Sequence, residues 1–179
     1  MSTTSSDARR RTHKGLGAIL GAFRDERRIR LMRMIDVGAK PITRRDAIAQ
    51  ARVRTRPDVI AAITGGVIEK GDVAAAATLA GIMAVKRTPD LLPLCHPISV
   101  TNSDVTVSFT DDSVVITSNV GITERTGVEM EALTAVAVAA LTVIDMIKSR
   151  DAAAEILGVR LLEKSGGKNG HWVRPADQS

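Results

Sequence analysis

Residues 126–148 read TGVEMEALTAVAVAALTVIDMIK and carry four ionisable side chains on an otherwise apolar, alanine-rich segment. Glu129 and Glu131 stand near its start, and Asp145 and Lys148 near its end. Apolar residues spaced by three and four predict one long helix with a buried face. That face comprises Leu133, Val136, Ala137, Ala140, Leu141, Ile144 and Ile147. Because Asp145 and Lys148 are three residues apart, we expect them to pair and to stay charged in a half-buried setting.

The length of this helix separates its carboxylates. In a continuous helix, Glu131 and Asp145 would lie roughly 21 Å apart along the axis, at about 1.5 Å per residue. One small reaction centre could not use both from the same chain. Either they serve opposite ends of a long substrate, or a second subunit brings the start of its helix near the end of this one across a two-fold interface. We favour the second arrangement.

The chain length and the single cysteine indicate a one-domain protein from a reducing compartment. A chain of 179 residues can bury a core without metal or disulfide support, and its single cysteine, Cys95, has no internal partner. No apolar run at the amino end resembles a secretion signal or a membrane span, so we expect a soluble cytoplasmic protein with no membrane partner.

The net charge of +5 is concentrated at the front of the chain, where residues 1–60 hold 15 Lys and Arg against 6 Asp and Glu. Nucleic acid is an unlikely partner, because the chain has no tyrosine, one tryptophan and two phenylalanines for base stacking. A solvated basic tail or a basic wall for a polyphosphate are the other interpretations. We divide the chain into a basic, partly disordered extension over 1–30, with a weak helical pattern over 15–30, and a folded domain over 31–175.

The domain alternates helical and β-prone segments. We expect a strand over 42–53, a short helix over 57–63, a helix that Asp72 caps and that runs to about Met83, and a hairpin of 100–109 with 114–120. A last strand over 159–162 precedes a glycine-rich loop over 165–170. This order predicts an α+β fold, with an antiparallel sheet and helices packed on one face.

Several side chains could do chemistry. His96 is either a proton carrier or a histidine hydrogen-bonded for structure, and Cys95 beside it is most simply a small buried apolar residue. Lys70, Lys148, Lys164 and Lys168 lie near acidic groups or glycine-rich turns, where ammonium groups and backbone N–H groups can approach phosphate oxygens together. No HxH, HExxH or CxxC spacing predicts a metal site.

Five segments in this order and spacing resemble the cyclic pyranopterin monophosphate synthase family, which acts in molybdenum cofactor biosynthesis. They are IDVGAKPITRRDA (35–47), EKGDV (69–73), AGIMAVKRTPDLLPLCHP (80–97), the long helix (126–148) and LLEKSGGKNG (161–170). The resemblance covers about residues 31–172. It implies a ferredoxin-like subunit in a homohexamer, a trimer of dimers, with active sites at subunit interfaces.

The resemblance also implies the reaction and its residues. The family converts (8S)-3′,8-cyclo-7,8-dihydroguanosine 5′-triphosphate, a cyclised GTP derivative, to cyclic pyranopterin monophosphate and releases pyrophosphate. It requires no cofactor, although magnesium could accompany the triphosphate. The implied catalytic set is Asp145, Lys70 and Lys148. The implied substrate-binding set is Leu94, Cys95, His96, Glu129, Met130, Glu131, Lys164 and Lys168, with the last two facing the triphosphate.

The chain departs from the family pattern at a few positions. Ile144 and Ile147 stand where tyrosine and cysteine are common, Asn169 replaces a serine, and Thr78 replaces an arginine. A missing arginine would remove a bidentate phosphate donor if that position faced the phosphates. Two alternatives therefore stay open: a divergent paralogue acting on another phosphorylated pterin or nucleotide, and a non-catalytic partner or nucleic-acid-binding protein.

Overall fold

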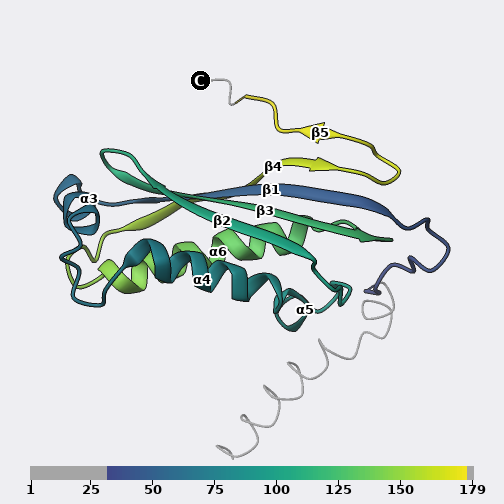
Figure 1. Cartoon of the computed structure of the whole chain (residues 1–179), viewed down its shortest axis with the longest axis horizontal. Helices are drawn as coiled ribbons and strands as arrows, with labels where there is room; N and C mark the ends of the chain where they lie inside the picture. The colour runs from purple at the N-terminus through teal and green to yellow at the C-terminus, as the bar shows by residue number, and fades with distance from the viewer. Residues whose placement is uncertain (1–31, 177–179) are drawn as a thin grey trace, which may run out of the picture. The chain divides into compact units, whose positions relative to one another are not determined.

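An antiparallel sheet with helices on one face organises the chain (Figure 1). The computed structural model describes residues 32–176, and within them five strands lie in the order β2-β3-β1-β4-β5. The strands are β1 (Thr43–Arg54), β2 (Asn102–Phe109), β3 (Ser113–Glu124), β4 (Glu155–Ser165) and β5 (Trp172–Val173). The helices are α3 (Pro57–Thr64), α4 (Val73–Val85), α5 (Thr88–Leu91) and α6 (Glu129–Ile147). The predicted α+β class is confirmed, and the β-α-β-β-α-β order is compatible with a ferredoxin-like arrangement.

Strand β1 is the centre of the sheet, paired antiparallel with β3 on one side and β4 on the other. Its residues alternate, so that Ala47, Ala49, Ala51 and Val53 are buried on the helix side. Small side chains at these positions let α6 lie close against the sheet, because an alanine methyl adds little height to the pleated surface. The start and end of α6 are thereby held under the two ends of β1.

The buried face of α6 is not the predicted one. Ala132, Ala135, Ala139 and Val143 face the core together with the predicted Val136, Ala140 and Ile147. Leu141 is 59% exposed, and the predicted Leu133, Ala137 and Ile144 are only partly buried. An alanine-rich helix presents two apolar stripes, and the sheet and α4 select the one with smaller side chains. The helix is long and apolar enough to span a membrane, but its buried residues pack as those of a core helix do.

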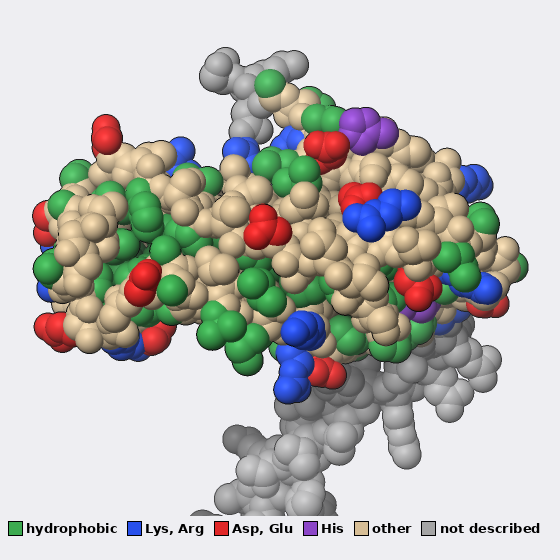
Figure 2. All heavy atoms as spheres, in the orientation of Figure 1, with side chains coloured by type: hydrophobic (Ala, Val, Ile, Leu, Met, Phe, Trp, Pro, Cys, Tyr) green, Lys and Arg blue, Asp and Glu red, His purple; other side chains and the backbone are tan. Residues whose placement is uncertain are grey.

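Helix α4 begins where the sequence predicts, because the Asp72 carboxylate accepts a hydrogen bond from the Ala75 N–H at 2.9 Å. Its buried side carries Val73, Ala77, Gly81, Ala84 and Val85 and faces α6 and β2. Leu79 and Met83 are exposed, and Figure 2 shows hydrophobic side chains along this helix at the surface. The helix runs slightly beyond its predicted end near Met83, to Val85.

Two other predictions concern where the strands begin and end. The hairpin of β2 and β3 is confirmed, with Phe109 opposite Val114 across the turn. The strand predicted over 159–162 was too short, because β4 runs from Glu155 to Ser165 with register shifts against β1 that interrupt its alternation. It is also not the last strand, since β5 follows it. The predicted extension over 1–30 and its helical segment over 15–30 lie outside the described residues.

Candidate active site

One group of predicted site residues lies at the carboxyl end of α6. Lys70 follows α3 in a turn over residues 68–71, and its Nζ donates to Asp145 Oδ2 at 2.7 Å and to the Asp145 carbonyl at 2.8 Å. Lys148 Nζ lies 2.8 Å from Asp145 Oδ1. The predicted Asp145–Lys148 pair is confirmed. The predicted half-buried setting was wrong for the single chain, since the two side chains are 57% and 61% exposed.

The two ammonium groups decide the charge of this cluster. The hydrogen bonds from Lys148 and Lys70 lower the pKa of Asp145 to about 2. Asp145 is therefore a carboxylate at neutral pH, held between two cations that occupy both of its oxygens. Such an arrangement can accept a proton at the carboxylate and supply one from an adjacent ammonium group.

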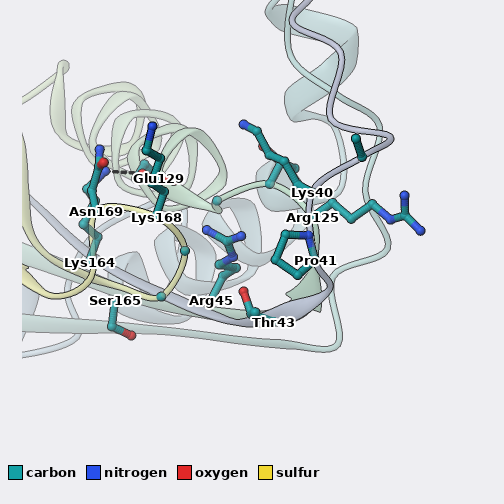
Figure 3. A pocket seen from close by; sticks show the side chains of 15 residues that line it. Lys40, Pro41, Thr43, Arg45, Arg125, Glu129, Lys164, Ser165, Lys168 and Asn169 are labelled. Atoms are coloured by element: carbon teal, nitrogen blue, oxygen red, sulfur yellow. Dashed lines mark hydrogen bonds and ion pairs between the residues drawn. The ribbon is translucent and has the colours of Figure 1, made fainter.

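A second group surrounds a pocket at the amino end of α6, with a volume of about 770 Å³. Figure 3 shows Glu129, Lys164 and Lys168 on one side of the pocket, Lys40 and Arg125 on the other, and Arg45 between them. Five cationic side chains and one carboxylate are thus among the described residues that line it. The pocket favours a multiply charged anion over a neutral ligand.

The carboxylate in this pocket is already paired. Glu129 Oε1 accepts from Lys164 Nζ at 2.8 Å, with both side chains partly buried. Burial is the largest single effect on Glu129 and raises its pKa, but the hydrogen bond from Lys164, a backbone hydrogen bond and the charges of Lys164 and Arg45 together lower the pKa of Glu129. Lys164 lies on β4 and faces α6 because it is paired in register with the inward-facing Ala47.

The glycine-rich loop shapes the pocket floor. Gly166 and Gly167 have φ of 88° and 75°, which glycine adopts readily and other residues rarely do. A Cβ at Gly166 would overlap the Arg44 carbonyl, and one at Gly167 would overlap the Arg45 guanidinium. The two glycines therefore give the Arg45 side chain its room.

Two polar atoms in this pocket lack partners. Arg45 Nε and Thr43 Oγ1 are buried without a hydrogen bond among the described residues. Because a buried N–H without an acceptor is costly, an anion that reaches Arg45 would remove that cost. The unpaired Arg45 N–H is compatible with an anion bound beside the guanidinium.

Besides the Asp145 cluster and the pocket, Glu131 makes a third contact, two residues after Glu129 in α6. Its side chain is 1% exposed, and its Oε1 lies 3.5 Å from Cys95 Sγ in the loop after α5. Burial raises the pKa of Glu131, and burial together with the Glu131 charge raises the pKa of Cys95 to about 11. Cys95 is half-buried and hydrogen-bonded, so the view of it as a small buried apolar residue was wrong.

The remaining predicted residues are the sequence neighbours of Cys95 and Glu131 at the amino end of α6. Leu94 and Met130 are exposed, and His96 is partly buried and has an interaction of its own. The structure thus brings Glu129, Lys164 and Lys168 together at one end of α6 and Lys70, Asp145 and Lys148 together at the other. A single chain does not unite the two groups.

Residue-by-residue reasoning assigned no role to Lys40, Arg45 and Arg125, although all three line the pocket. One signal could have found Arg45. It shares the odd-numbered parity of Ala47, Ala49 and Ala51 in β1, which places it on the helix side of the sheet. Arg125 donates to the Gly38 carbonyl and so fastens the segment that carries Lys40.

No three of His, Cys, Asp or Glu approach one another as a metal site would require within the part of the chain that the structure describes. Thr78 and Ile144 are also not among the residues that line the pocket.

Comparison with known proteins bears on the same residues. The model of the MoaC family matches residues 34–167, which include every site residue named above except Lys168. The chain belongs to the MoaC family. A cyclic pyranopterin monophosphate synthase of Streptomyces coelicolor is 54% identical over 142 residues, which cover 79% of this chain and 84% of that protein.

Two further family members come from other lineages. The cyclic pyranopterin monophosphate synthase of Heliobacterium modesticaldum is 53% identical over 79% of this chain and 91% of its own length. That of Thermomicrobium roseum is 50% identical over 82% of this chain and 90% of its own length. The predicted family membership is confirmed across most of the chain.

Proposed function

We propose that this protein is a cyclic pyranopterin monophosphate synthase of molybdenum cofactor biosynthesis. It converts (8S)-3′,8-cyclo-7,8-dihydroguanosine 5′-triphosphate to cyclic pyranopterin monophosphate and releases pyrophosphate. The observation that carries the proposal is the pocket at the start of α6, whose cations and unpartnered Arg45 N–H suit a triphosphate. The chain belongs to the MoaC family, and similar members of that family are named cyclic pyranopterin monophosphate synthases, which supports the proposal.

The triphosphate would occupy the cationic pocket. Lys164 and Lys168 on one wall and Arg45 on the floor would contact its oxygens, and backbone N–H groups of the glycine-rich loop would add donors. Expulsion of pyrophosphate develops negative charge on the leaving group. Cations already in place stabilise that charge without rearrangement of solvent. Any magnesium would arrive with the triphosphate and not on a protein site.

Proton transfers would belong to the other cluster. Asp145 would act as acid or base on the ring system, and Lys70 and Lys148 would exchange protons with it or with the substrate. Leu94, His96 and Met130 would contact the substrate at the amino end of α6, beside Glu129 and Glu131. These roles require the clusters to meet at one substrate.

A second copy of the chain would bring them together. Leu133, Ala137, Leu141 and Ile144 form an apolar stripe on α6 that the core leaves partly or largely exposed. Two such helices packed antiparallel about a two-fold axis would bury this stripe and bring the partner subunit's Asp145 toward the pocket of this chain. We propose a dimer of this kind, repeated three times in a homohexamer that acts in the cytoplasm.

The experiment that tests the function supplies freshly prepared cyclised dihydro-GTP and measures two products. Pyrophosphate release and the fluorescence of oxidised pyranopterin should rise together with the parent protein. Lys70→Ala should abolish both signals while circular dichroism stays unchanged. A folded, oligomeric parent that yields neither product would contradict the proposal and favour another phosphorylated substrate.

A further inference from the structure

We propose that Cys95 is a positioning residue: its thiol donates a hydrogen bond to the buried Glu131 carboxylate, joining the loop after α5 to the first turn of α6. This role differs from contact with the substrate. The inference about catalysis rests on the function proposed above, whereas the inference about the contact itself does not.

The contact between Cys95 and Glu131 is shielded from water and held on both sides. Glu131 is the third residue of α6 and is 1% exposed, so water reaches its carboxylate very little. Cys95 Sγ lies 3.5 Å from Glu131 Oε1, within the range of a sulfur donor. The Cys95 backbone is fixed by its own N–H, which donates to the Leu92 carbonyl at 3.0 Å. The thiol therefore approaches the carboxylate from a segment that is separately held.

The thiol hydrogen bond opposes other effects that raise the pKa of Glu131. Burial raises the pKa of Glu131, and the negative charge of Glu129 on the same helix acts in the same direction. The hydrogen bond from Cys95 and a backbone N–H oppose that rise. Lys164 on β4 pairs with Glu129 instead. Loss of the thiol would therefore leave Glu131 with fewer donors and a higher pKa.

The same contact excludes Cys95 as a nucleophile near neutral pH. Burial, followed by the charge of Glu131 and the hydrogen bond to it, raises the pKa of the Cys95 thiol to about 11. A thiol that stays protonated can donate a hydrogen bond but attacks electrophiles slowly. Donation to Glu131 is thus the chemistry that the site permits.

Thiol labelling tests the contact without any substrate. Cys95 is the single cysteine of the chain, so reaction with a chromogenic disulfide such as DTNB reports on it alone. Glu131→Gln removes the neighbouring charge and lowers the pKa of the thiol, so at pH 8 we expect labelling to accelerate several-fold, since each pKa unit is about tenfold in thiolate fraction. Glu129→Gln is the matched control and should label at nearly the parent rate.

Two labelling results would overturn the contact. One is a folded Glu131→Gln variant that labels at the parent rate. The other is a parent protein that labels as fast as free cysteine, which is incompatible with a strongly raised thiol pKa. The second result needs no variant, so the test survives even if Glu131→Gln does not fold.

The pH profile of kcat/KM tests the positioning role. Cys95→Ala should raise the pKa of Glu131 and so move the acidic limb to higher pH, with activity lost in acid and little changed at pH 8. Cys95→Ser keeps an O–H donor and should restore much of the parent profile. An equal loss at every pH through KM, or no change in either variant, would overturn the role. An inactive parent would contradict the proposed function while the labelling result still decides the contact.

Discussion

At the scale of single residues, Asp145 is the side chain on which the proposed reaction most depends. Asp145→Asn keeps the size of the side chain but removes the charge between Lys70 and Lys148, so kcat should fall about 10²- to 10⁴-fold. The thermal midpoint should change little because the side chain is largely exposed. The matched control is Asp112→Asn, an exposed carboxylate paired with Arg52 on the hairpin turn. Equal activity in the two variants would remove Asp145 from the mechanism.

Two glycines of the last loop separate backbone strain from the position of Arg45. Gly167 and Gly170 both have positive φ, so alanine at either should cost about 1–2 kcal/mol of unfolding free energy. A Cβ at Gly170 meets no atom within 4 Å, whereas one at Gly167 overlaps the Arg45 guanidinium. Gly167→Ala should therefore raise KM several-fold more than Gly170→Ala, in steady-state assays at saturating and limiting substrate. The same KM in both would show that Arg45 does not bind substrate.

At the scale of elements, the crossing of α4 and α6 depends on Gly81. An added Cβ would lie 3.1 Å from a Val105 methyl and 3.2 Å from the Ala135 carbonyl. The gain of about 0.5–1 kcal/mol for alanine in a helix is smaller than the typical overpacking cost of about 1–3 kcal/mol. Gly81→Ala should thus lower the denaturant midpoint. Gly158→Ala on β4, where a Cβ meets no neighbour, should leave it unchanged or raise it.

The junction between β1 and the end of α6 should respond to acid. The buried Asp151 carboxylate accepts from Thr55 Oγ1 at 2.8 Å and from the Ala153 N–H at 3.0 Å. The Thr55 hydrogen bond, acting against burial, lowers the pKa of Asp151 below its usual range. A lowered pKa stabilises the fold above the ordinary aspartate pKa, and that stabilisation is lost as pH falls through the folded value.

Thermal midpoints across pH test this junction. Asp151→Asn should lower the midpoint at pH 7, and the difference from the parent should shrink as the pH falls below the ordinary aspartate pKa of about 4 and the parent carboxylate becomes protonated. A difference that stays constant over this range would mean that Asp151 contributes through its shape and not through its charge.

At the scale of the whole molecule, two inactive variants should complement each other. Lys164→Met damages the pocket end of α6 and Asp145→Asn the other end. In a mixed dimer, one site would take its pocket from one subunit and its Asp145 from the other, both intact. Random reassembly of equal amounts should recover about a quarter of the parent activity, since half of the dimers are mixed and one of their two sites is whole.

The control for this experiment mixes two variants of the same end. Asp145→Asn with Lys70→Ala should recover nothing, because each mixed site lacks one of the paired groups. Recovery in the control, or silence in the first mixture despite exchange of subunits, would contradict a site shared across the α6 helices.

Sequence patterns predicted the long helices and the hairpin, although not α5 or β5. Asp72 marked the start of α4 because a carboxylate before an apolar run caps a helix, and two β-prone runs around Asp111 and Asp112 marked the hairpin. Helix length alone separated Glu131 from Asp145. Each of these depends on local bonds or on spacing along one element, so neighbours in sequence carry the information.

Tertiary structure decided which surfaces meet. Leu133 and Leu141 are more hydrophobic than the alanines of α6, yet Ala132, Ala135 and Ala139 are buried and the two leucines are not, because docking against the sheet and α4 fixes which face of the helix is covered. The Glu131–Cys95 contact, and the meeting of Arg45 with a loop 120 residues away, likewise arise from strand register and helix docking. Packing in three dimensions selects among faces that periodicity leaves equivalent, and that selection forms the pocket.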